Sequence, residues 1–364
     1  MDRPHQAGHE IINGTDYEFL RSPTYQGNGF GRLMNMAVFS LQLLIHARRL
    51  KRAHGRPAMI IASSPHPYAF ISAHFLAHCF ASLSVFEVRD IWPLSLIELA
   101  DTSPTHLLVR FTGWLERQAY RHADAVVSLL PHAQEHMIPL GLCASRWHYI
   151  PNGVEAPPAD TIEEGSESLT LARKWQDEGR FVIVYAGALG KPNHVHTLLQ
   201  ALSRPVLQDV NMGVIVIGRG DMAICLRAMV ETSGIEDKVR VLDQVSKSAI
   251  QTLLRNVSAG YVSLRPQSLF RFGVSPNKLF DYMLASLPII AAIRAGNDPV
   301  ADAGCGYTVD PDDVDAIAEC IVQLANKPVE ERVAMGARGR DYVLNMHNYE
   351  TLANRFLNLL SPRP

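Results

Sequence analysis

The sequence predicts an α/β protein built from two Rossmann-like domains. At 364 residues the chain is too long for one ordinary hydrophobic core. Short apolar runs alternate with longer helical patterns, which is typical of a parallel sheet covered by helices. A polar stretch from Pro151 to about Glu167, rich in proline and glycine, interrupts this alternation and predicts a domain boundary.

The strands are predicted from the apolar runs. In the first half of the chain they fall at 59–63, 83–88, 124–130 and 147–150, and in the second half they begin at positions 181, 213, 238, 259 and 287. The first 58 residues offer no strand, glycine-rich turn and helix, so the N-terminal domain is predicted to lack its first βα unit. We expect an N-terminal domain over 1–152, a C-terminal domain over 153–342 and a closing helical segment over 343–364.

Composition excludes several classes of protein. The 47% hydrophobic and 19% charged content is typical of a folded globular chain, and no apolar run reaches the roughly 18 residues of a spanning helix. A net charge of -2 without a polybasic tail argues against a nucleic-acid partner. The five cysteines form no CxxC pair and the first residues lack the apolar segment of a signal peptide. We therefore expect reduced core cysteines and a cytoplasmic protein.

The most informative segment runs from Arg271 to Pro288. Ser275 is a good N-cap and Pro276 suits the first helical position, so a helix with a free, anion-binding N-terminus is predicted here. Lys278 adds a full positive charge in the first turn. Asp281 follows three residues later on the same face and is suited to accept hydrogen bonds from a ribose. The pattern predicts a nucleotide site, and the alternative is an amphipathic helix in which Lys278 pairs with Asp281.

Several stretches resemble the retaining glycosyltransferases of family four, most closely the N-acetylfucosaminyl-transferase-like enzymes of O-antigen and capsule synthesis. They are FEVRDIWPLSLIEL, ADAVVSLL, YIPNGV, VYAGALG, SPNKLFDYMLASLPII and GNDPVADAGCGYTVDPDD. They follow the family's order and cover nearly the whole chain. The resemblance implies a GT-B fold, in which two Rossmann-like domains face a cleft and the closing helix crosses back to the first domain.

The resemblance also implies an activity. The enzyme would move a hexosyl-type sugar, with retention, from a nucleotide sugar on the C-terminal domain to an acceptor on the N-terminal one. We expect a UDP-sugar as donor and a lipid-linked saccharide as acceptor, in the synthesis of lipopolysaccharide, capsule or exopolysaccharide.

The family's donor-site pattern is only partly present. Relatives carry two carboxylates eight residues apart, whereas here Asp281 holds the second position and Gly273 the first. The Arg and Lys that clamp the diphosphate in relatives are replaced by Ala188 and Asn193, so its charge must be met mainly by Lys278 and helix amides. The full set of residues expected at the donor is Gly187, Lys191, Arg219, Arg271, Gly273, Ser275, Pro276, Asn277, Lys278 and Asp281.

Three residues are candidates for catalysis in the first domain. Arg89 and Asp90 follow a predicted buried strand, at the edge where α/β domains bind ligands. Many relatives have a His-Asp pair here. Asp90 is expected to orient the acceptor hydroxyl or accept its proton, and Arg89 to steady a phosphate or hold Asp90; a structural ion pair is the alternative. His66 ends a neighbouring strand and is a second candidate base or acceptor ligand, unless it is an ordinary surface histidine.

The sequence argues against a bound metal but favours contact with a membrane surface. His74 and His78 have metal-ligand spacing, but no third ligand accompanies them, so we expect no metal and no cofactor. The basic segment 46–56 follows an apolar helical pattern, which suits either an anionic lipid surface or the dipole of a helix end. Arg110, Trp114, Arg117 and Arg121 are expected to extend this face. Because related enzymes act on lipid-diphosphate acceptors, we expect a peripheral protein on the inner face of the plasma membrane.

Two alternative functions remain open. A nucleotide-sugar 2-epimerase would share the fold and the donor but would need no acceptor. A catalytically idle homologue acting as a partner is suggested by the short first domain and by Gly273, Ala188 and Asn193. A dinucleotide oxidoreductase is a poor third option, because no G-x-G-x-x-G follows any predicted strand.

Overall fold

The computed structural model describes residues 7–12, 14–24, 30–64, 67–98, 102–156 and 163–361. Contacts divide the chain into two compact units, the first made of Met1–Ile150 with Arg355–Pro364 and the second of Pro151–Asn354. The boundary therefore lies two residues before the predicted one, and the closing segment joins the first unit at position 355 rather than 343. The early boundary follows from hydrogen bonds of Asn152 to Ser275, which tie it to the second unit.

The first unit is built on a parallel sheet of four strands in the order β3-β4-β5-β6. The strands are β3 (Met59–Ser64), β4 (Leu83–Val88), β5 (Ala125–Ser128) and β6 (Trp147–Tyr149). Each lies within two residues of its predicted position, because strands buried in a parallel sheet are written as nearly continuous apolar runs. The helices between them are α2 (Tyr68–Phe80), α3 (Leu94–Glu98), α4 (Leu107–His122) and α5 (Gln134–Met137), and two 3₁₀ turns follow at Ile138–Leu140 and Ala144–Arg146.

The N-terminal segment differs from a Rossmann opening. Strands β1 (Gly8–Ile12) and β2 (Thr15–Phe19) form a separate antiparallel hairpin, and the long helix α1 (Phe30–His54) follows. Among the described residues, β3 pairs only with β4 and is an edge strand of its sheet. Within the described residues no further strand joins this sheet beside β3, which is consistent with the prediction, whereas the hairpin was not predicted.

The second unit is built on a parallel sheet of six strands in the order β12-β11-β10-β7-β8-β9. The strands are β7 (Phe181–Ala186), β8 (Met212–Ile217), β9 (Val239–Leu242), β10 (Ala259–Ser263), β11 (Ile289–Ala292) and β12 (Gly306–Val309). Only β12 was not predicted. The strand order reverses between β7 and β10, and in such sheets ligands bind beyond the carboxyl ends of the strands at this point.

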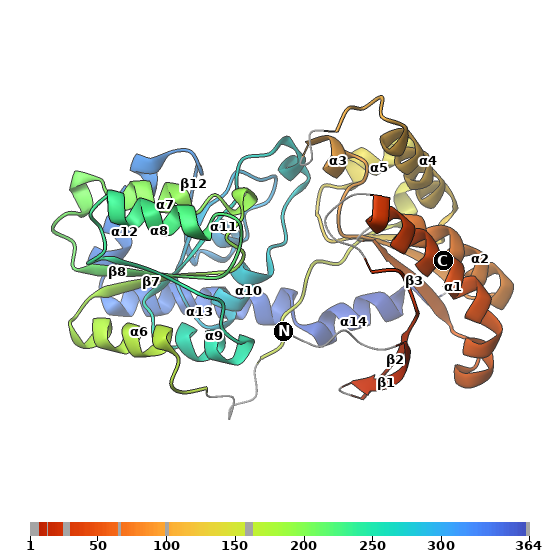
Figure 1. Ribbon diagram of the computed structural model, residues 1–364. Coiled ribbons are helices and arrows are strands. Elements are labelled where there is room, and N and C mark those ends of the chain that lie inside the picture. Colours follow the sequence, from red (N-terminus) through yellow and green to blue (C-terminus); the bar gives the residue numbers. More distant parts are fainter. Residues whose placement is uncertain are drawn as a thin grey trace. The chain divides into compact units, whose positions relative to one another are not determined.

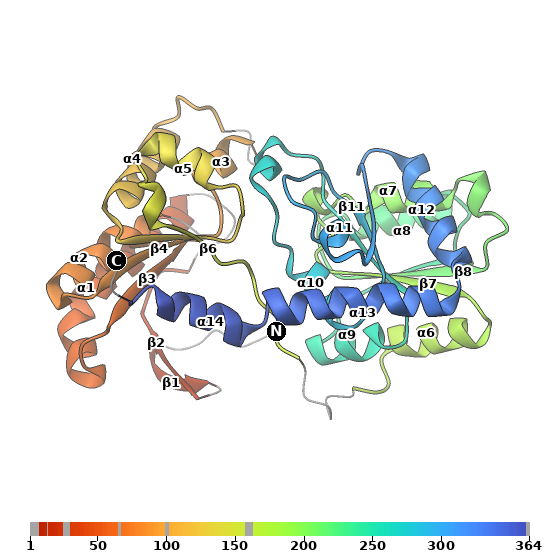
Figure 2. The same ribbon diagram turned by 180° about the vertical axis from the view of Figure 1, so that it is seen from behind.

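Helices cover both faces of this sheet (Figure 1). Helices α7 (His196–Leu202), α8 (Ala223–Thr232) and α12 (Val314–Asn326) bury one hydrophobic cluster, and α6 (Glu167–Asp177), α9 (Lys247–Leu254), α10 (Asn277–Leu284) and α13 (Val329–Met346) bury the other. Figure 2 shows α13 alongside α10, against which it packs. The short α11 (Pro299–Ala303) precedes β12, and α14 (Tyr349–Asn358) follows α13. Among its described residues, this unit also contains 3₁₀ segments at Lys191–Asn193, Pro205–Leu207 and Ser268–Phe272.

Two further observations bear on the expectations from sequence. All five cysteines are free, but only Cys305 and Cys320 are buried. Cys79, Cys143 and Cys225 are exposed, so the expectation that the cysteines are core residues is wrong for these three. Within the described part of the chain, no helix combines the length and the apolar character needed to cross a bilayer.

Candidate functional site

The second unit contains a cavity of about 500 Å³ beyond the carboxyl ends of β7, β8 and β9, called here the β7–β8 cavity. Its size lies within the roughly 300–1,000 Å³ of small-molecule sites. It is lined by Ala186, Gly187, Ala188, Ile217, Gly218, Arg219, Gln244, Val245, Lys247, Ile250 and Asp281. Three of the residues predicted for the donor, Gly187, Arg219 and Asp281, are therefore brought together here.

Two glycines let the loops after β7 and β8 approach each other at this cavity. A Cβ on Gly218 would lie 1.8 Å from the carbonyl oxygen of Gly187, which no side chain tolerates. The amide of Gly187 donates to Ile217 at 2.9 Å, and that of Leu189 donates to Arg219 at 2.9 Å. The result is a lining of bare backbone, which a ligand can approach closely.

Lys278, in the first turn of α10, is a partly buried cation beside Gly187. Its Nζ donates to the hydroxyl of Tyr185 at 2.7 Å and to Oδ1 of Asn193 at 3.1 Å, and lies 4.2 Å from the centre of the Tyr185 ring. A Cβ on Gly187 would lie 2.7 Å from this Nζ. Burial lowers the pKa of the lysine to about 8. Among the described residues, no carboxylate forms an ion pair with it, so the alternative Lys278–Asp281 pair is wrong.

Asp281 lies one turn further along α10 and faces the β7–β8 cavity. It is half-buried, and burial raises the pKa of its carboxyl group while Lys247 acts in the opposite direction. One helix thus presents a cation near the cavity and a carboxylate in its lining. This arrangement matches the needs of a diphosphate and a ribose, respectively.

The start of α10 differs from the prediction. The helix begins at Asn277, Pro276 occupies the N-cap position, and no side chain caps it. The hydroxyl of Ser275 instead accepts a hydrogen bond from the backbone amide of Asn152 at 3.1 Å. The expected N-cap role of Ser275 is therefore wrong, because its hydroxyl binds Asn152 instead of the first turn of α10. The side chain of Asn277 is exposed.

Arg271 and Gly273 lie just before α10 but do not line the cavity. The exposed Arg271 donates to the carbonyl of Ser268 at 2.5 Å and lies over the ring of Phe272. Gly273 has a φ of 104°, a left-handed conformation that favours glycine. A carboxylate-bearing side chain would be strained at this position, which gives a physical reason for the departure from the family pattern.

Lys191 is separated from the other donor candidates. It lines a second cavity of about 300 Å³, formed by the loop between β7 and α7, which shares no lining residue with the β7–β8 cavity. Ala188 lines the first cavity and Leu189 lines the second. The loop therefore divides the two, and a direct role of Lys191 at the β7–β8 cavity is not supported.

The candidates in the first unit are exposed or lie outside the described residues. Arg89 and Asp90 are exposed and directly follow β4, as predicted. His66 lies outside the described residues. His74 is accounted for by packing, since its Nδ1 bonds to the Ser84 hydroxyl at 3.0 Å and its ring stacks on Phe70. Its role is therefore structural.

The lining of the β7–β8 cavity includes residues that were not predicted from the sequence, among them Gln244, Val245 and Lys247. They directly follow β9, at the same carboxyl edge as the residues that were found, and this position was a usable signal. A polar network fixes the start of α9 beside them. The carboxylate of Glu163 accepts hydrogen bonds from the hydroxyls of Ser246 and Ser248. The backbone amide of Glu163 donates to the hydroxyl of Thr252 at 3.0 Å.

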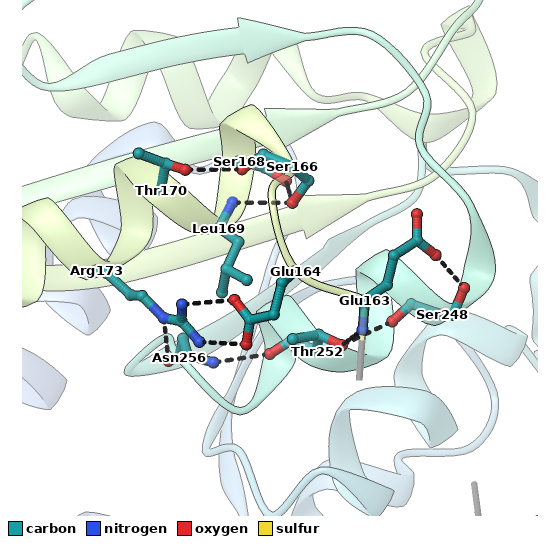
Figure 3. A network of polar contacts seen from close by, with 10 residues as sticks. All are labelled: Glu163, Glu164, Ser166, Ser168, Leu169, Thr170, Arg173, Ser248, Thr252 and Asn256. Carbon is teal, nitrogen blue, oxygen red and sulfur yellow. Dashed lines mark hydrogen bonds and ion pairs between the residues drawn. The ribbon is translucent and has the colours of Figure 1, made fainter. Parts of the chain in front are cut away.

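Figure 3 shows how this network continues to α6. Arg173 forms a two-pronged ion pair with Glu164 at 2.7 and 2.9 Å. Ser166 caps α6 by accepting from the amide of Leu169, and Asn256 donates to the carbonyl of Thr252. The network joins the starts of α6 and α9, and Lys247 is the first residue of α9.

Two family models match the two halves of the chain. "Glycosyl transferase 4-like domain" matches residues 3–153, and "Glycosyl transferases group 1" matches residues 180–327. Two relatives have assigned activities. The GDP-mannose-dependent monoacylated alpha-(1-6)-phosphatidylinositol monomannoside mannosyltransferase of Corynebacterium glutamicum is 21% identical over 264 residues, covering 69% of this chain and 68% of the relative. The alpha-D-kanosaminyltransferase of Streptomyces kanamyceticus is 24% identical over 244 residues, covering 64% and 61%, respectively.

Solved structures match over nearly the whole chain. HepE of Anabaena in complex with UDP aligns with a TM-score of 0.66 at 16% identity, covering 91% of this chain and 83% of HepE. Sucrose-phosphate synthase from Thermosynechococcus elongatus aligns with a TM-score of 0.70 at 16% identity, covering 98% and 85%. WaaG, a glycosyltransferase of lipopolysaccharide biosynthesis, aligns with a TM-score of 0.63 at 14% identity, covering 94% and 86%. Because glycosyltransferase domain models match both halves and these structures share the fold, the chain is a glycosyltransferase of the GT-B type.

Proposed function

We propose that this glycosyltransferase takes a hexosyl-type sugar from a UDP-sugar and transfers it, with retention, to a lipid-linked saccharide in the synthesis of a surface polysaccharide. The observation that carries the donor proposal is the Lys278 cation, which lies against the bare backbone of Gly187 at the β7–β8 cavity without a carboxylate partner among the described residues. A partly buried cation of this kind is costly unless an anion binds it. A diphosphate is such an anion.

The nucleotide is proposed to lie in the β7–β8 cavity. Asp281 accepts hydrogen bonds from the ribose hydroxyls, and Lys278 faces the diphosphate. Gln244 and Val245 follow β9 and line the cavity, and we propose that they contact the base. HepE, which has a similar fold, has been solved with UDP and with UDP-glucose, and this supports a uridine nucleotide.

In the proposed reaction the bond between the anomeric carbon and the diphosphate oxygen breaks as the acceptor hydroxyl attacks the same face of the sugar. Negative charge grows on the departing diphosphate, and Lys278 stabilises it. Asp90, exposed after β4, is the candidate in the first unit for binding the hydroxyl or accepting its proton. The product keeps the anomeric configuration.

The lipid-linked acceptor is supported by the surface of the first unit. Helix α2 packs against both α1 and α4, and each of the three helices exposes large apolar side chains. They are Leu41 and Ile45 of α1, Ile71 and Phe75 of α2, and Phe111 and Trp114 of α4. Exposed arginines accompany them at positions 48, 52, 110 and 121. Apolar and basic side chains together favour an anionic membrane surface, where a lipid-linked substrate lies.

The basic segment 46–56 contributes less to this surface than its composition suggests. Arg49 pairs with Glu18 at 2.8 Å, Lys51 lies over the ring of Phe80, and Arg56 donates to a backbone carbonyl of Ala81. These three cations have partners within the protein. The exposed aromatic residues of α2 and α4 therefore carry more of the proposal than the basic segment does.

The donor proposal is tested by calorimetric titration of the purified chain with UDP, GDP, ADP and dTDP. UDP is expected to bind most tightly, and the Lys278→Met variant is expected to bind it weakly. Lys174→Met, which removes the same charge from an exposed site on α6, is the matched control and should bind like the original protein. Equal affinity for all four nucleotides, or full affinity in Lys278→Met, contradicts the proposal.

Two further assays separate transfer from the alternatives. A 2-epimerase converts the donor without an acceptor, whereas the proposed transferase needs one, so incubation with UDP-sugars alone decides between them. Co-sedimentation with phosphatidylglycerol vesicles tests the membrane surface. Phe75→Asp and Trp114→Asp are expected to reduce vesicle binding without loss of UDP binding, and unchanged vesicle binding contradicts this surface.

A further inference from the structure

The second unit contains another cavity, of about 300 Å³, which the donor proposal does not use. It is formed by the loop between β7 and α7 together with the start of α8, and is called here the β7–α7 cavity. It lies on the sheet face covered by α7 and α8, whereas α9 and α10 cover the face of the donor residues. The two cavities share no lining residue.

Four of the side chains that line the β7–α7 cavity are cationic or can become so. They are Lys191, His194, His196 and Arg265, and no carboxylate lines the cavity with them. Among the described residues, neither Lys191 nor Arg265 forms an ion pair with an acidic side chain. Two unpaired full charges therefore meet two imidazoles at one cavity.

His194 is an independent indication of a ligand site. It is 8% exposed and adopts a left-handed conformation with φ of 53°. Its Nε2 bonds to Asp312 at 2.9 Å, whereas its buried Nδ1 has no hydrogen-bond partner. An unsatisfied buried nitrogen and a strained backbone are both costly, and they often occur where a ligand is bound.

The positive groups also act on one another. Burial lowers the pKa of the His196 imidazole, and His194 and Arg265 lower it further, while Asp312 opposes them. The rings of His194 and His196 meet edge to face, with 4.5 Å between their centres. Asp221 lies near the rim, 3.5 Å from the position of a Cβ on Gly190, but does not line the cavity. An anion in the cavity would relieve this repulsion.

We propose that the β7–α7 cavity is a second anion site, which binds a phosphate ester separately from the donor nucleotide. A planar guanidinium with a lysine and two imidazoles offers the several donors that a tetrahedral phosphate accepts. Met222 and Leu226 add apolar side chains to the lining, which suit the organic group of the ester. The phosphate belongs either to a small soluble ester or to the head group of a lipid.

The first test is titration with inorganic pyrophosphate, with and without saturating UDP. Binding is expected to persist when UDP fills the donor site, because the two cavities are separate. Arg265→Met and His196→Gln are expected to weaken this binding about tenfold, as loss of a charged hydrogen bond does. Both variants should bind UDP with unchanged affinity, and Arg240→Met, an exposed arginine of β9, should change neither ligand.

Failure of the second anion site can be told apart from failure of the donor site, because UDP binding reports on the donor site alone. Loss of pyrophosphate binding when UDP is present, or full pyrophosphate affinity in Arg265→Met, overturns the second site and leaves the donor site unaffected. The source of the phosphate is decided with phosphatidylcholine vesicles that carry an isoprenyl diphosphate. Recruitment of the protein that depends on Arg265 indicates a lipid head group, and binding of soluble pyrophosphate alone indicates a soluble ester. Absence of both overturns the proposal.

Discussion

Two regions of the second unit differ in whether their charged side chains have partners of opposite charge or hydroxyl donors. At the starts of α6 and α9, the charged side chains Glu163, Glu164 and Arg173 are exposed, and each has a hydrogen-bonding partner. In the first turn of α10, Lys278 is partly buried, and its hydrogen-bond partners among the described residues are the neutral oxygens of Tyr185 and Asn193. The first arrangement stabilises the fold. The second leaves a charge unpaired at a cavity, and the difference indicates which region is built for a ligand.

The largest expected effect comes from removing the unpaired charge. Lys278→Met should weaken UDP binding by about 2–3 kcal/mol, or roughly 30- to 150-fold, because a charged contact to the diphosphate is lost. The free protein should be more stable, by about 1–3 kcal/mol at pH 7, since a desolvated charge is removed. Calorimetry and urea unfolding measure the two effects. A variant that is less stable but binds UDP normally would make Lys278 a structural residue like Arg173.

The second effect concerns the carboxylate on the same helix. Asp281→Asn should weaken UDP binding about tenfold, because a neutral amide is a poorer acceptor for the ribose hydroxyls. The original protein should prefer UDP to 2′-deoxy-UDP, and the variant should lose most of this preference. Competition binding with the two nucleotides measures it. The same preference in both proteins would place the ribose away from Asp281.

A third effect is the pH dependence of UDP binding. The pKa of Lys278 is about 8 in the free protein, and a bound diphosphate favours its protonated form. Protonated lysine is therefore present below pH 8, and affinity should fall, by up to about tenfold per pH unit, as the pH rises above 8. Titrations at pH 7, 8, 9 and 9.5 measure the slope. Lys278→Met should show no such fall, and the same slope in both proteins would assign it to another group.

The smallest effect is expected in the paired region. Hydrogen bonds from Ser246 and Ser248 lower the pKa of Glu163, so its contribution to stability is present at neutral pH and is lost as the pH falls through its lowered pKa. Glu163→Gln should lower the melting temperature slightly and weaken UDP binding no more than about twofold, through the position of Lys247. Thermal melts at pH 7 and at pH 3 measure it. Glu167→Gln, in the first turn of α6, is the matched control.

Features of the fold and site that depend on residues close together in the sequence could be predicted from it. Strands β7 and β8 were found because strands buried on both faces are continuous apolar runs. The placement of Lys278 and Asp281 on one helix could be predicted because helical spacing alone puts them one turn apart. The hairpin of β1 and β2 also had a local signal, an Asn-Gly pair at 13–14, which was overlooked.

The features that sequence did not predict depend on distant contacts. The N-cap assigned to Ser275 failed because Asn152, 123 residues away, takes its hydroxyl. Lys247 joins the site only because β9 lies beside β8 in the sheet. Lys191 was expected to help neutralise the diphosphate in place of the Arg and Lys that relatives carry, but the loop turns between the two cavities. Strand order and loop direction are tertiary properties that short motifs do not contain.

A crystal structure of the protein with UDP and pyrophosphate tests the central claim most directly. We expect uridine in the β7–β8 cavity, with the ribose hydroxyls on Asp281 and the diphosphate within ion-pair distance of Lys278. Pyrophosphate is expected in the β7–α7 cavity, on Arg265 and His196. A UDP molecule whose diphosphate lies on Arg265 and His196, with Lys278 still bound only to Tyr185 and Asn193, would contradict it.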